Sequence, residues 1–492
     1  MSRNKSAHAT PIRFGTDGWR ALIANEFTFT NVERVAQAYA DYLQQQPQGD
    51  DRSRRSAPSV VVGYDRRFLS EQFALRAAEV LAGNQIQVAM FDSDMPTPLV
   101  SWAVREQKAS GGVVITASHN PPLFNGFKIK APFGGSATPE MTRAVETLVD
   151  SSPPRRGELS ARSQQPDNAQ QSQKALPASV ASYRAQVASY IDLERLRAER
   201  ARVVIDPMHG TGGRWVESFL EGGALEVETI RAERDTLFGG VAPEPIDRNL
   251  APLKERVRAT GALVGLATDG DADRVGAVSD AGETMTMHEV VPLIVLHLAR
   301  RRGMTGGVVR TFSQSVLTKR IAAAHNLRLY ETPIGFKYIA DLMLRENILV
   351  GAEESGGIGV QGHIPERDGI LNSLLLLEAV VMSGKRPTEL VREMHREFGE
   401  FYFGRRDLHT EVAVGLSLIS TLAAAPPGEV AGFEVTGVEK LDGTKLLFAD
   451  ESWLLFRQSG TEPVLRIYAE ATSIAKMNAL LEHGAQKADV RG

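Results

Sequence analysis

The chain of 492 residues contains no cysteine. Disulfide bonds, thiolate catalysis and cysteine-ligated metals are therefore excluded. It also lacks any run of about eighteen apolar residues, so no membrane span is expected. Its first residues form no apolar signal region. From these absences we expect a soluble cytoplasmic protein.

The chain also lacks a strong excess of charge, with 56 basic and 60 acidic residues and a net charge of −4. This balance gives no reason to expect nucleic acid or an acidic membrane surface as a partner. Hydrophobic residues make up 42% of the chain, which is enough for globular packing. Because the chain is too long for a single core, we expect three or four domains.

A serine follows the expected end of a buried strand. Residues 113–115 form a β-branched run typical of such a strand, and two prolines at 121–122 prevent its continuation. Open α/β sheets place ligand sites at the carboxyl ends of their strands, so Ser118 and His119 are candidate site residues. Ser118 would need an activating partner to act as a nucleophile. A turn serine that caps local backbone is the alternative.

Three aspartates, Asp269, Asp271 and Asp273, alternate directly after the apolar run 263–267. Carboxylates this close together repel one another unless a cation neutralises them, and Mg²⁺ prefers such oxygen ligands. An EF-hand calcium loop is excluded, because Arg274 replaces its glycine and no glutamate ends the loop. An acidic surface turn is the other alternative. The position after a buried strand favours a metal site.

A short segment between two expected strands carries the groups that bind a phosphate dianion. Arg457 offers a bidentate charge, Ser459 and Thr461 offer hydroxyl groups, and Gly460 exposes backbone amides. Arg466 stands two positions into the next strand and could add a second charge. A hairpin turn with a solvated arginine is the alternative.

A glycine-bracketed acidic loop holds Glu353, Glu354 and Ser355. Its carboxylates could bind sugar hydroxyl groups, could form a general acid/base pair, or could merely begin a helix. Lys128 and Lys337 each follow a glycine closely, and either could supply charge to a phosphate or carry a proton.

These groups together favour phosphoryl transfer to and from a serine beside Mg²⁺, with a separate phosphate clamp. A serine hydrolase fits worse, because Ser118 lacks the glycine-flanked elbow of those enzymes and the aspartate triplet would be unexplained. A glycine-rich segment near the amino terminus, which contains Arg20, would allow close approach to a ligand or form a tight turn.

Strands and helices alternate along most of the chain, which favours parallel α/β architecture. Three similar units begin with apolar strands at residues 60–62, 202–206 and 306–311, and they suggest a repeated domain. Helices are expected at 31–46 and 70–83.

The composition changes at two places along the chain. A tract rich in Gln, Ser and Pro predicts a polar linker at residues 156–178. After about residue 400, strands at 452–456 and 464–468 precede a helix that begins after Ser473 and is expected to stop at Gly484. This order predicts a smaller α+β domain at the carboxyl terminus.

The motifs, in this order, resemble those of the α-D-phosphohexomutases, the phosphoglucomutase/phosphomannomutase group, over residues 12–480. The matching segments are the phosphoserine loop (116–121), the magnesium loop (269–274), the sugar loop (352–355) and the phosphate loop (457–461).

The resemblance implies an α/β protein of four domains around a central cleft, three of them related mixed-sheet domains and the last a smaller α+β domain. We place domain I at residues 1–155, the linker at 156–178, domain II at 179–283, domain III at 284–400 and domain IV at 401–492. The resemblance also implies a mutase that interconverts hexose 1- and 6-phosphates through a phosphoserine and a hexose 1,6-bisphosphate, which also serves as activator.

The resemblance assigns roles to particular residues. Ser118 would carry the phosphoryl group and would bind Mg²⁺ together with Asp269, Asp271 and Asp273. Residues expected to assist transfer or proton movement are Arg20, His119, Lys128 and Lys337. Residues expected to bind substrate are Glu353, Ser355, Arg274, Thr332, Gly335, Arg457, Ser459, Gly460, Thr461 and Arg466.

Two positions depart from the family pattern. Ala352 replaces a usual glycine, and Gly357 stands where several mannose- and glucosamine-handling relatives have histidine. The second departure favours glucose as the sugar. Phosphomannomutase and phosphoglucosamine mutase remain alternatives, as does a non-catalytic protein that binds sugar phosphates on the same fold.

Overall fold

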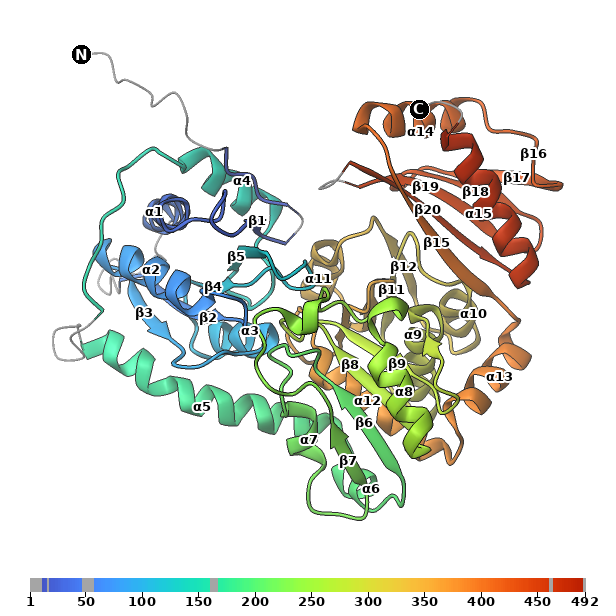
Figure 1. Cartoon of the computed structure of the whole chain (residues 1–492), viewed down its shortest axis with the longest axis horizontal. Coiled ribbons are helices and arrows are strands. Elements are labelled where there is room, and N and C mark those ends of the chain that lie inside the picture. Colours follow the sequence, from blue (N-terminus) through green and yellow to red (C-terminus); the bar gives the residue numbers. More distant parts are fainter. Residues whose placement is uncertain (1–10, 16, 47–56, 160–166, 460–462, 490–492) are drawn as a thin grey trace.

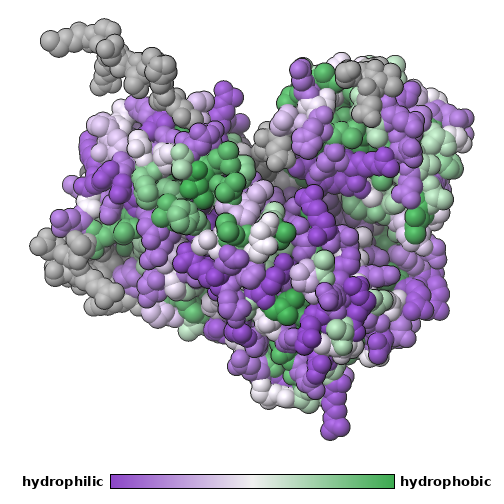
Figure 2. All heavy atoms as spheres, in the orientation of Figure 1, coloured by the Kyte–Doolittle hydropathy of each residue, from purple (hydrophilic) through white to green (hydrophobic). Residues whose placement is uncertain are grey.

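The computed structural model describes residues 11–15, 17–46, 57–159, 167–459 and 463–489. Four sheets with their helices form four domains, coloured in Figure 1 from blue (domain I) through green to red (domain IV). A notch opens between domain I and domain IV in the space-filling view (Figure 2). The predicted α/β architecture of four domains is confirmed.

Domain I contains a five-stranded sheet in the order β1-β5-β4-β2-β3. Its strands are β1 (Trp19–Leu22), β2 (Ser59–Tyr64), β3 (Gln87–Met90), β4 (Gly111–Ile115) and β5 (Phe124–Lys130). Its helices are α1 (Phe29–Gln45), α2 (Ser70–Gly83), α3 (Thr97–Glu106) and α4 (Pro139–Leu148). The expected helices at 31–46 and 70–83 are confirmed as α1 and α2.

Domain II has the sheet order β10-β9-β8-β6-β7. Its strands are β6 (Arg202–Asp206), β7 (Glu226–Thr229), β8 (Val264–Thr268), β9 (Val275–Val278) and β10 (Thr284–Met285). Its helices are α5 (Asp167–Tyr190), α6 (Leu193–Arg197), α7 (Trp215–Leu220), η1 (Phe238–Gly240), η2 (Asp247–Asn249) and α8 (Ala251–Thr260).

Domain III has the sheet order β12-β11-β13-β14. Its strands are β11 (Gly307–Thr311), β12 (Leu329–Thr332), β13 (Ile348–Ala352) and β14 (Ile358–Val360). Its helices are α9 (Met287–Leu296), η3 (His297–Arg301), α10 (Val316–Ala324), α11 (Phe336–Arg345), α12 (Gly369–Ser383) and α13 (Pro387–Phe398).

Domain IV contains a six-stranded antiparallel sheet in the order β15-β20-β19-β18-β17-β16. Its strands are β15 (Tyr402–His409), β16 (Glu429–Val430), β17 (Phe433–Glu439), β18 (Thr444–Phe448), β19 (Trp453–Gln458) and β20 (Val464–Ala471). Its helices are α14 (Val412–Ala424) and α15 (Ile474–Asp489). The two strands predicted near the carboxyl terminus are β19 and β20, which pair directly.

The repeated unit predicted for the first three domains is confirmed by their strand pairing. In each domain three parallel strands stand side by side, and a fourth strand returns antiparallel: β5 beside β4, β9 beside β8 and β14 beside β13. The valine-rich strands β2, β6 and β11 are buried because parallel sheets are covered by helices on both faces.

Residues 167–178, which form the carboxyl-terminal half of the predicted polar linker, are helical and belong to α5. Gln173 both donates to and accepts from the backbone of Met90, at 2.8 and 2.9 Å, so its side chain completes the open edge of β3. Leu176 is buried at the same helix. This polar segment therefore contributes one buried apolar side chain, Leu176, and one amide that pairs with a strand.

The predicted helix stop at Gly484 is wrong, since α15 continues to Asp489. A side-chain carbon at Gly484 would lie 2.9 Å from Ile467, so the glycine lets the helix pack closely on β20. This glycine therefore serves packing and does not end the helix. In the described part of the chain, no helix combines the length and the apolar character needed to cross a membrane.

Candidate active site

The three repeated domains each supply one loop to the site, and the three loops are topologically equivalent. Each follows the last parallel strand and leads into the antiparallel strand: residues 116–123 after β4, 269–274 after β8 and 353–357 after β13. These loops carry three of the four segments that the sequence predicts to be functional. Ligand sites at the carboxyl ends of parallel strands follow the general rule for α/β sheets.

Ser118 occupies a constrained position at the end of β4. Its backbone has φ of 52°, in the left-handed region that non-glycine residues rarely adopt, and its side chain is buried. Its N–H donates to Thr116 Oγ1 at 2.8 Å. The loop is further fixed by the buried Arg67, which donates to the carbonyl oxygens of Ser118 and Asn120, both at 2.6 Å. Such strain in a well-held loop is typical of functional sites.

The hydroxyl group of Ser118 lies against the second loop. Ser118 Oγ donates to Asp269 Oδ2 at 2.8 Å, and His119 Nδ1 lies 3.3 Å from the same serine oxygen. Burial, together with the nearby Arg274 and Arg20, holds the pKa of His119 well below its ordinary value, so the ring is neutral. The serine is therefore placed between a carboxylate and a neutral imidazole.

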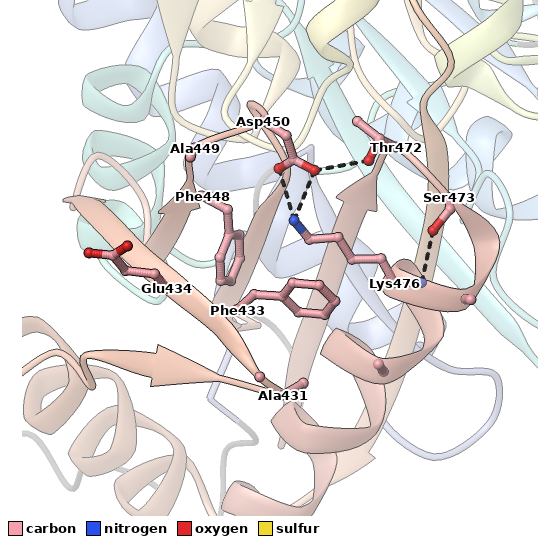
Figure 3. A pocket seen from close by; sticks show the side chains of 12 residues that line it. Ala431, Phe433, Glu434, Phe448, Ala449, Asp450, Thr472, Ser473 and Lys476 are labelled. Carbon is pink, nitrogen blue, oxygen red and sulfur yellow. Dashed lines mark hydrogen bonds and ion pairs between the residues drawn. The ribbon is translucent and has the colours of Figure 1, made fainter.

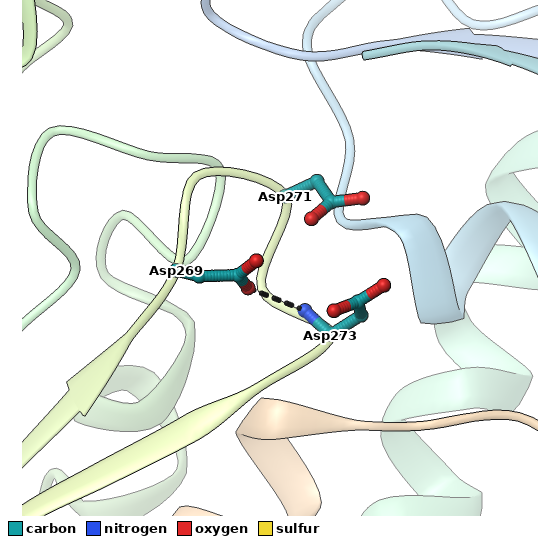
Figure 4. A group of neighbouring side chains, drawn as sticks. All are labelled: Asp269, Asp271 and Asp273. Carbon is teal, nitrogen blue, oxygen red and sulfur yellow. Dashed lines mark hydrogen bonds between the residues drawn. The ribbon is translucent and has the colours of Figure 1, made fainter. Parts of the chain in front are cut away.

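Asp269, Asp271 and Asp273 converge at the turn between β8 and β9 (Figure 4), where ligand oxygens from all three lie within 4.8 Å of one another. Oδ1 of Asp271 and Oδ1 of Asp273 are buried and accept no hydrogen bond from the described residues. Buried carboxylate oxygens without a donor are costly unless a cation binds them. The three side chains therefore fit a hard divalent cation such as Mg²⁺.

Lys128 on β5 supplies positive charge beside this group. Its Nζ lies 2.8 Å from Asp271 Oδ2, 3.2 Å from Asp273 Oδ2 and 2.8 Å from Asp17 Oδ2, and its side chain is 1% exposed. Burial opposes the charged form, but the three carboxylates outweigh it and raise the pKa of Lys128. The ammonium group is therefore permanently charged.

Arg367 joins three domains at the same point. Its Nη2 lies 2.6 Å from Asp17 Oδ2 of domain I and 2.8 Å from Asp273 Oδ2 of domain II, while Nη1 lies 3.8 Å from Glu353 Oε2 of domain III. Burial raises the pKa of Glu353 to about 7, although Arg367 acts in the opposite direction. Glu353 therefore changes charge close to neutral pH.

The aspartate loop and the acidic loop of domain III are joined directly through their backbones. Val275 N donates to the carbonyl oxygen of Gly356 at 3.0 Å, and Arg274 forms an isolated β-bridge with Gly357. Gly356 has φ of 92°, and a side-chain carbon there would lie 2.4 Å from the carbonyl oxygen of Val275. This contact requires glycine and brings Glu353 towards the aspartates.

The fourth predicted segment lies between β19 and β20 in domain IV. Arg457 and Arg466 stand directly opposite each other on these strands, and Asp407 of β15 stands opposite Arg466 on the other side. Two arginines at opposed positions repel unless an anion or a carboxylate neutralises them. Ser459 is buried at the end of β19, whereas Gly460 and Thr461 lie outside the described residues.

Comparisons with known proteins agree with this arrangement. Family models of phosphoglucomutase/phosphomannomutase match alpha/beta/alpha domain I over residues 11–156, domain II over 181–282, domain III over 287–398 and the C-terminal domain over 423–486. The phosphoglucomutase/phosphomannomutase of Thermococcus kodakarensis is 31% identical over 480 residues, which cover 96% of this chain and 97% of that protein. The chain belongs to the phosphoglucomutase/phosphomannomutase family.

Other members of this family carry different sugar names. A "Probable phosphoglucosamine mutase" of Methanothermobacter thermautotrophicus is 29% identical over 481 residues, which cover 96% of each chain. The solved "putative phosphomannomutase" of Thermus thermophilus is 35% identical, covers 99% of this chain and 100% of that one, and has a TM-score of 0.83. As a family member, the protein is a phosphohexomutase, an intramolecular phosphotransferase.

The structure brings some of the predicted site residues together and leaves others apart. Arg20 on β1 donates to Asn120 Oδ1 at 2.7 Å and so borders the serine loop. Thr332 is the last residue of β12, and Gly335 directly precedes α11. Lys337 lies in the first turn of α11, with its Nζ 5.0 Å from the ring centroid of Tyr338. Among the described residues, no hydrogen bond or ion pair joins Lys337 to the serine or the aspartates.

Sequence reasoning missed Asp17 and Arg367, which form ion pairs between the repeated domains of this phosphoglucomutase/phosphomannomutase family member. Asp17 lies between glycines close to Arg20, in a segment singled out only for its glycines and arginines. Burial opposes ionisation of Asp17, but Lys128 and Arg367 hold its pKa well below the ordinary value. Arg367 belongs to a run of three charged residues, 366–368, that directly precedes α12. This run was the feature of the sequence that could have indicated Arg367.

Proposed function

We propose that this protein interconverts hexose 1-phosphate and hexose 6-phosphate, with glucose as the preferred sugar, through a phosphoserine at Ser118. The observation that carries the proposal is the 2.8 Å hydrogen bond from Ser118 Oγ to Asp269, within a group of three buried aspartates. A hydroxyl group beside a cation site can accept and return a phosphoryl group, whereas an isolated turn serine has no such partner.

In the first half-reaction, the bond from the phosphoserine oxygen to phosphorus breaks while phosphorus bonds to a hydroxyl oxygen of the hexose phosphate. The proton of that hydroxyl group passes to a neighbouring base, and the serine oxygen that leaves phosphorus takes up a proton in turn. His119 is neutral, and Glu353 has a pKa of about 7, so both can take part in proton transfer at neutral pH. Arg20 and Lys128 would hold the charge of the transferred group.

Asp269, Asp271 and Asp273, together with Ser118, would hold Mg²⁺. When bound, the cation supplies positive charge to the oxygens of the transferring phosphoryl group. Arg367 and Lys128 keep the carboxylates in place, since each donates to Asp273 and to Asp17. The protein residues thereby fix the direction in which the ligand oxygens point.

The hexose 1,6-bisphosphate formed in this way must turn around before its other phosphate returns to Ser118. Arg457, Ser459, Gly460, Thr461 and Arg466 would bind whichever phosphate is not reacting. Arg457 and Arg466 are two positively charged side chains at directly opposite strand positions, and both can donate to one phosphate. Glu353 and Ser355 would bind sugar hydroxyl groups in both orientations, and Arg274, Thr332 and Gly335 remain predicted substrate contacts. Lys337 remains predicted to assist transfer or proton movement. Bisphosphate added from outside would restore phosphoserine that has been lost to water.

Glucose is proposed because the position of Gly357 leaves no room for a side chain. A side-chain carbon at this position would lie 2.4 Å from Arg367 Cδ and 3.1 Å from Glu353 Oε2. A histidine, as in several mannose- and glucosamine-handling relatives, would therefore displace Arg367 from its place next to Glu353. The names of related proteins support glucosamine and mannose as the competing sugars.

The test is a coupled mutase assay with glucose, mannose and glucosamine 1-phosphates, each with its own 1,6-bisphosphate and Mg²⁺ present. We expect conversion of all three to be measurable and kcat/KM to be highest for glucose 1-phosphate. A higher kcat/KM for glucosamine or mannose 1-phosphate would reassign the sugar while leaving the mutase in place. No conversion of any of them would refute the proposal.

A further inference from the structure

One carboxylate of domain IV touches both the predicted phosphate clamp and domain III. Asp442 lies in the turn between β17 and β18, and its Oδ2 accepts a hydrogen bond from Arg457 Nε at 2.9 Å. The same oxygen accepts from the backbone N–H of Ile334 at 2.8 Å. Ile334 belongs to the loop 332–337, which contains two of the predicted substrate residues, Thr332 and Gly335, and the predicted catalytic Lys337.

The position of Asp442 is fixed by packing around it. The next residue, Gly443, has φ of 102°, and a side-chain carbon there would lie 2.3 Å from the carbonyl oxygen of Phe456, so the turn presses against β19. Lys445, two residues further on, is buried against domain III, with its Nζ 3.7 Å from the ring centroid of Phe312 and 3.6 Å from Glu331 Oε1. The turn is therefore held from both domains.

The geometry of the bond suits a supporting role. Asp442 engages Nε of Arg457, so this bond does not use the two Nη groups, which form the end of the guanidinium that binds phosphate in a bidentate manner. A charged partner on Nε fixes the plane of the guanidinium and so reduces the entropy lost when the phosphate binds.

We propose that Asp442 is the positioning residue of the phosphate clamp: it orients Arg457 towards the non-reacting phosphate and ties the clamp to loop 332–337. This inference rests on the proposed function, in which Arg457 binds that phosphate. The opposite possibility is that Asp442 competes with phosphate for Arg457, and the two possibilities predict changes of opposite sign.

The test compares full-length Asp442→Asn, Arg457→Ala and the double variant with the parent enzyme. Asp442→Asn removes the charge but keeps the shape, and we expect the KM for glucose 1-phosphate to rise about tenfold while kcat changes less than about twofold. We expect the Kd for glucose 1,6-bisphosphate, measured by calorimetry, to rise in parallel. In the Arg457→Ala background the same substitution should add nothing, because Asp442 acts through Arg457.

Asp450→Asn is the matched control. Asp450 belongs to the same domain and forms a comparable pair with Lys476, at 2.9 Å, beside α15 (Figure 3). Successive residues of a strand point to opposite faces of the sheet, so Phe448 and Lys445 of β18 lie on opposite faces. The pair of Asp450 with Lys476, next to Phe448, is therefore separated by the sheet from the face on which Lys445 contacts domain III. We therefore expect Asp450→Asn to leave KM unchanged.

Three results would overturn the inference. A KM that is unchanged or lower in Asp442→Asn, while Arg457→Ala raises it, would overturn the positioning role alone. An equal further rise in the double variant would show that Asp442 acts independently of Arg457. An unchanged KM in Arg457→Ala would overturn the proposed clamp as well. If Asp442→Asn does not yield folded protein, Asp442→Ser is measured in its place with the same criteria.

Discussion

Within the described residues, buried side chains of both charges lie around Ser118, and the ion pairs between them leave part of the aspartate group without a hydrogen-bond donor. Lys128 and Arg367 pair with Asp17, Asp271 and Asp273, yet two aspartate oxygens still accept no hydrogen bond from the described part of the chain. Buried carboxylate oxygens without a hydrogen-bond donor favour binding of a cation over stability of the empty fold. Changes at single residues should therefore affect metal binding and activity more than folding.

Asp271→Asn tests the cation site. We expect loss of one charged ligand to weaken Mg²⁺ binding and to lower kcat by at least about a hundredfold, with the circular dichroism spectrum unchanged. Activity of the parent enzyme should disappear in excess EDTA and return when Mg²⁺ is added. Asp247→Asn, which changes an exposed carboxylate of the same domain, is the control and should behave as the parent. Full activity in excess EDTA would contradict a metal-dependent mechanism.

Glu353 should give the enzyme a pH dependence near neutrality. Its pKa is raised from 4.5 to about 7, chiefly by burial, so ionisation of this group costs the folded state stability as pH rises from about 4.5 to 7. If the carboxylate binds sugar hydroxyl groups, kcat/KM for glucose 1-phosphate should rise with pH through about 7. Glu353→Gln, which cannot ionise, should lack this step. An identical pH profile in the variant would assign the step to another group.

At the scale of elements, the equivalent loops of domains I and II touch at Gly270. A side-chain carbon at Gly270 would lie 2.5 Å from the carbonyl oxygen of Ser118 and 2.9 Å from Pro243 Cγ. Gly270→Ala should therefore push the serine loop away from the aspartates. We expect the free energy of unfolding to fall by about 1–3 kcal/mol and kcat to fall as well.

Urea denaturation and steady-state kinetics measure the two effects of Gly270→Ala. Gly428→Ala is the control, because a side-chain carbon at that position would meet no atom within 4 Å. Stability and kcat equal to those of the parent would show that the two loops do not need this close approach.

The loops at the ends of β4, β8 and β13 could be predicted from sequence because short apolar strands precede them. A buried strand followed by polar or glycine-rich residues gives the position of a site without knowledge of the partners. The same reasoning could not predict Arg367, because its three partners are distant in sequence and come together only through domain packing.

Helix α5 shows a different limit of prediction. Its amino-terminal half is polar, and its helical state depends on tertiary contacts such as the pairing of Gln173 with β3. Intrinsic propensity is a weak guide wherever such contacts decide the structure. The continuation of α15 past Gly484 was missed for the same reason, because the close contact with Ile467 is not local.

At the scale of the whole molecule, domains III and IV share buried polar contacts. Glu470 of β20 is fully buried and accepts hydrogen bonds from Ser315 Oγ at 2.5 Å, from Val316 N at 2.9 Å and from Trp453 Nε1 at 2.9 Å. The carboxylate thus satisfies the amino terminus of α10 in one domain and an indole of the other. The domain that carries the predicted clamp is therefore fixed to domain III.

In the proposed reaction, different domains would bind the two phosphates of the substrate. The three repeated loops would hold the reacting phosphoryl group at Ser118, while the domain IV sheet would bind the other phosphate. Figure 2 shows a notch between domains I and IV, the two domains that would hold the two phosphates. Turning the bisphosphate within the site would then exchange the two phosphates between Ser118 and Arg457.

The central claim, a phosphoserine at Ser118 that exchanges with substrate, is tested most directly by following the phosphate itself. The enzyme is incubated with glucose 1,6-bisphosphate labelled with ³²P and separated from free sugar. One portion of the labelled enzyme is digested and mapped by peptide mass spectrometry, and a second, intact portion is mixed with unlabelled glucose 1-phosphate. We predict about one phosphate per chain, located on Ser118, and its transfer to the sugar as bisphosphate, with no labelling of Ser118→Ala. Label on another residue, or label on Ser118 that never passes to the sugar, would contradict the account.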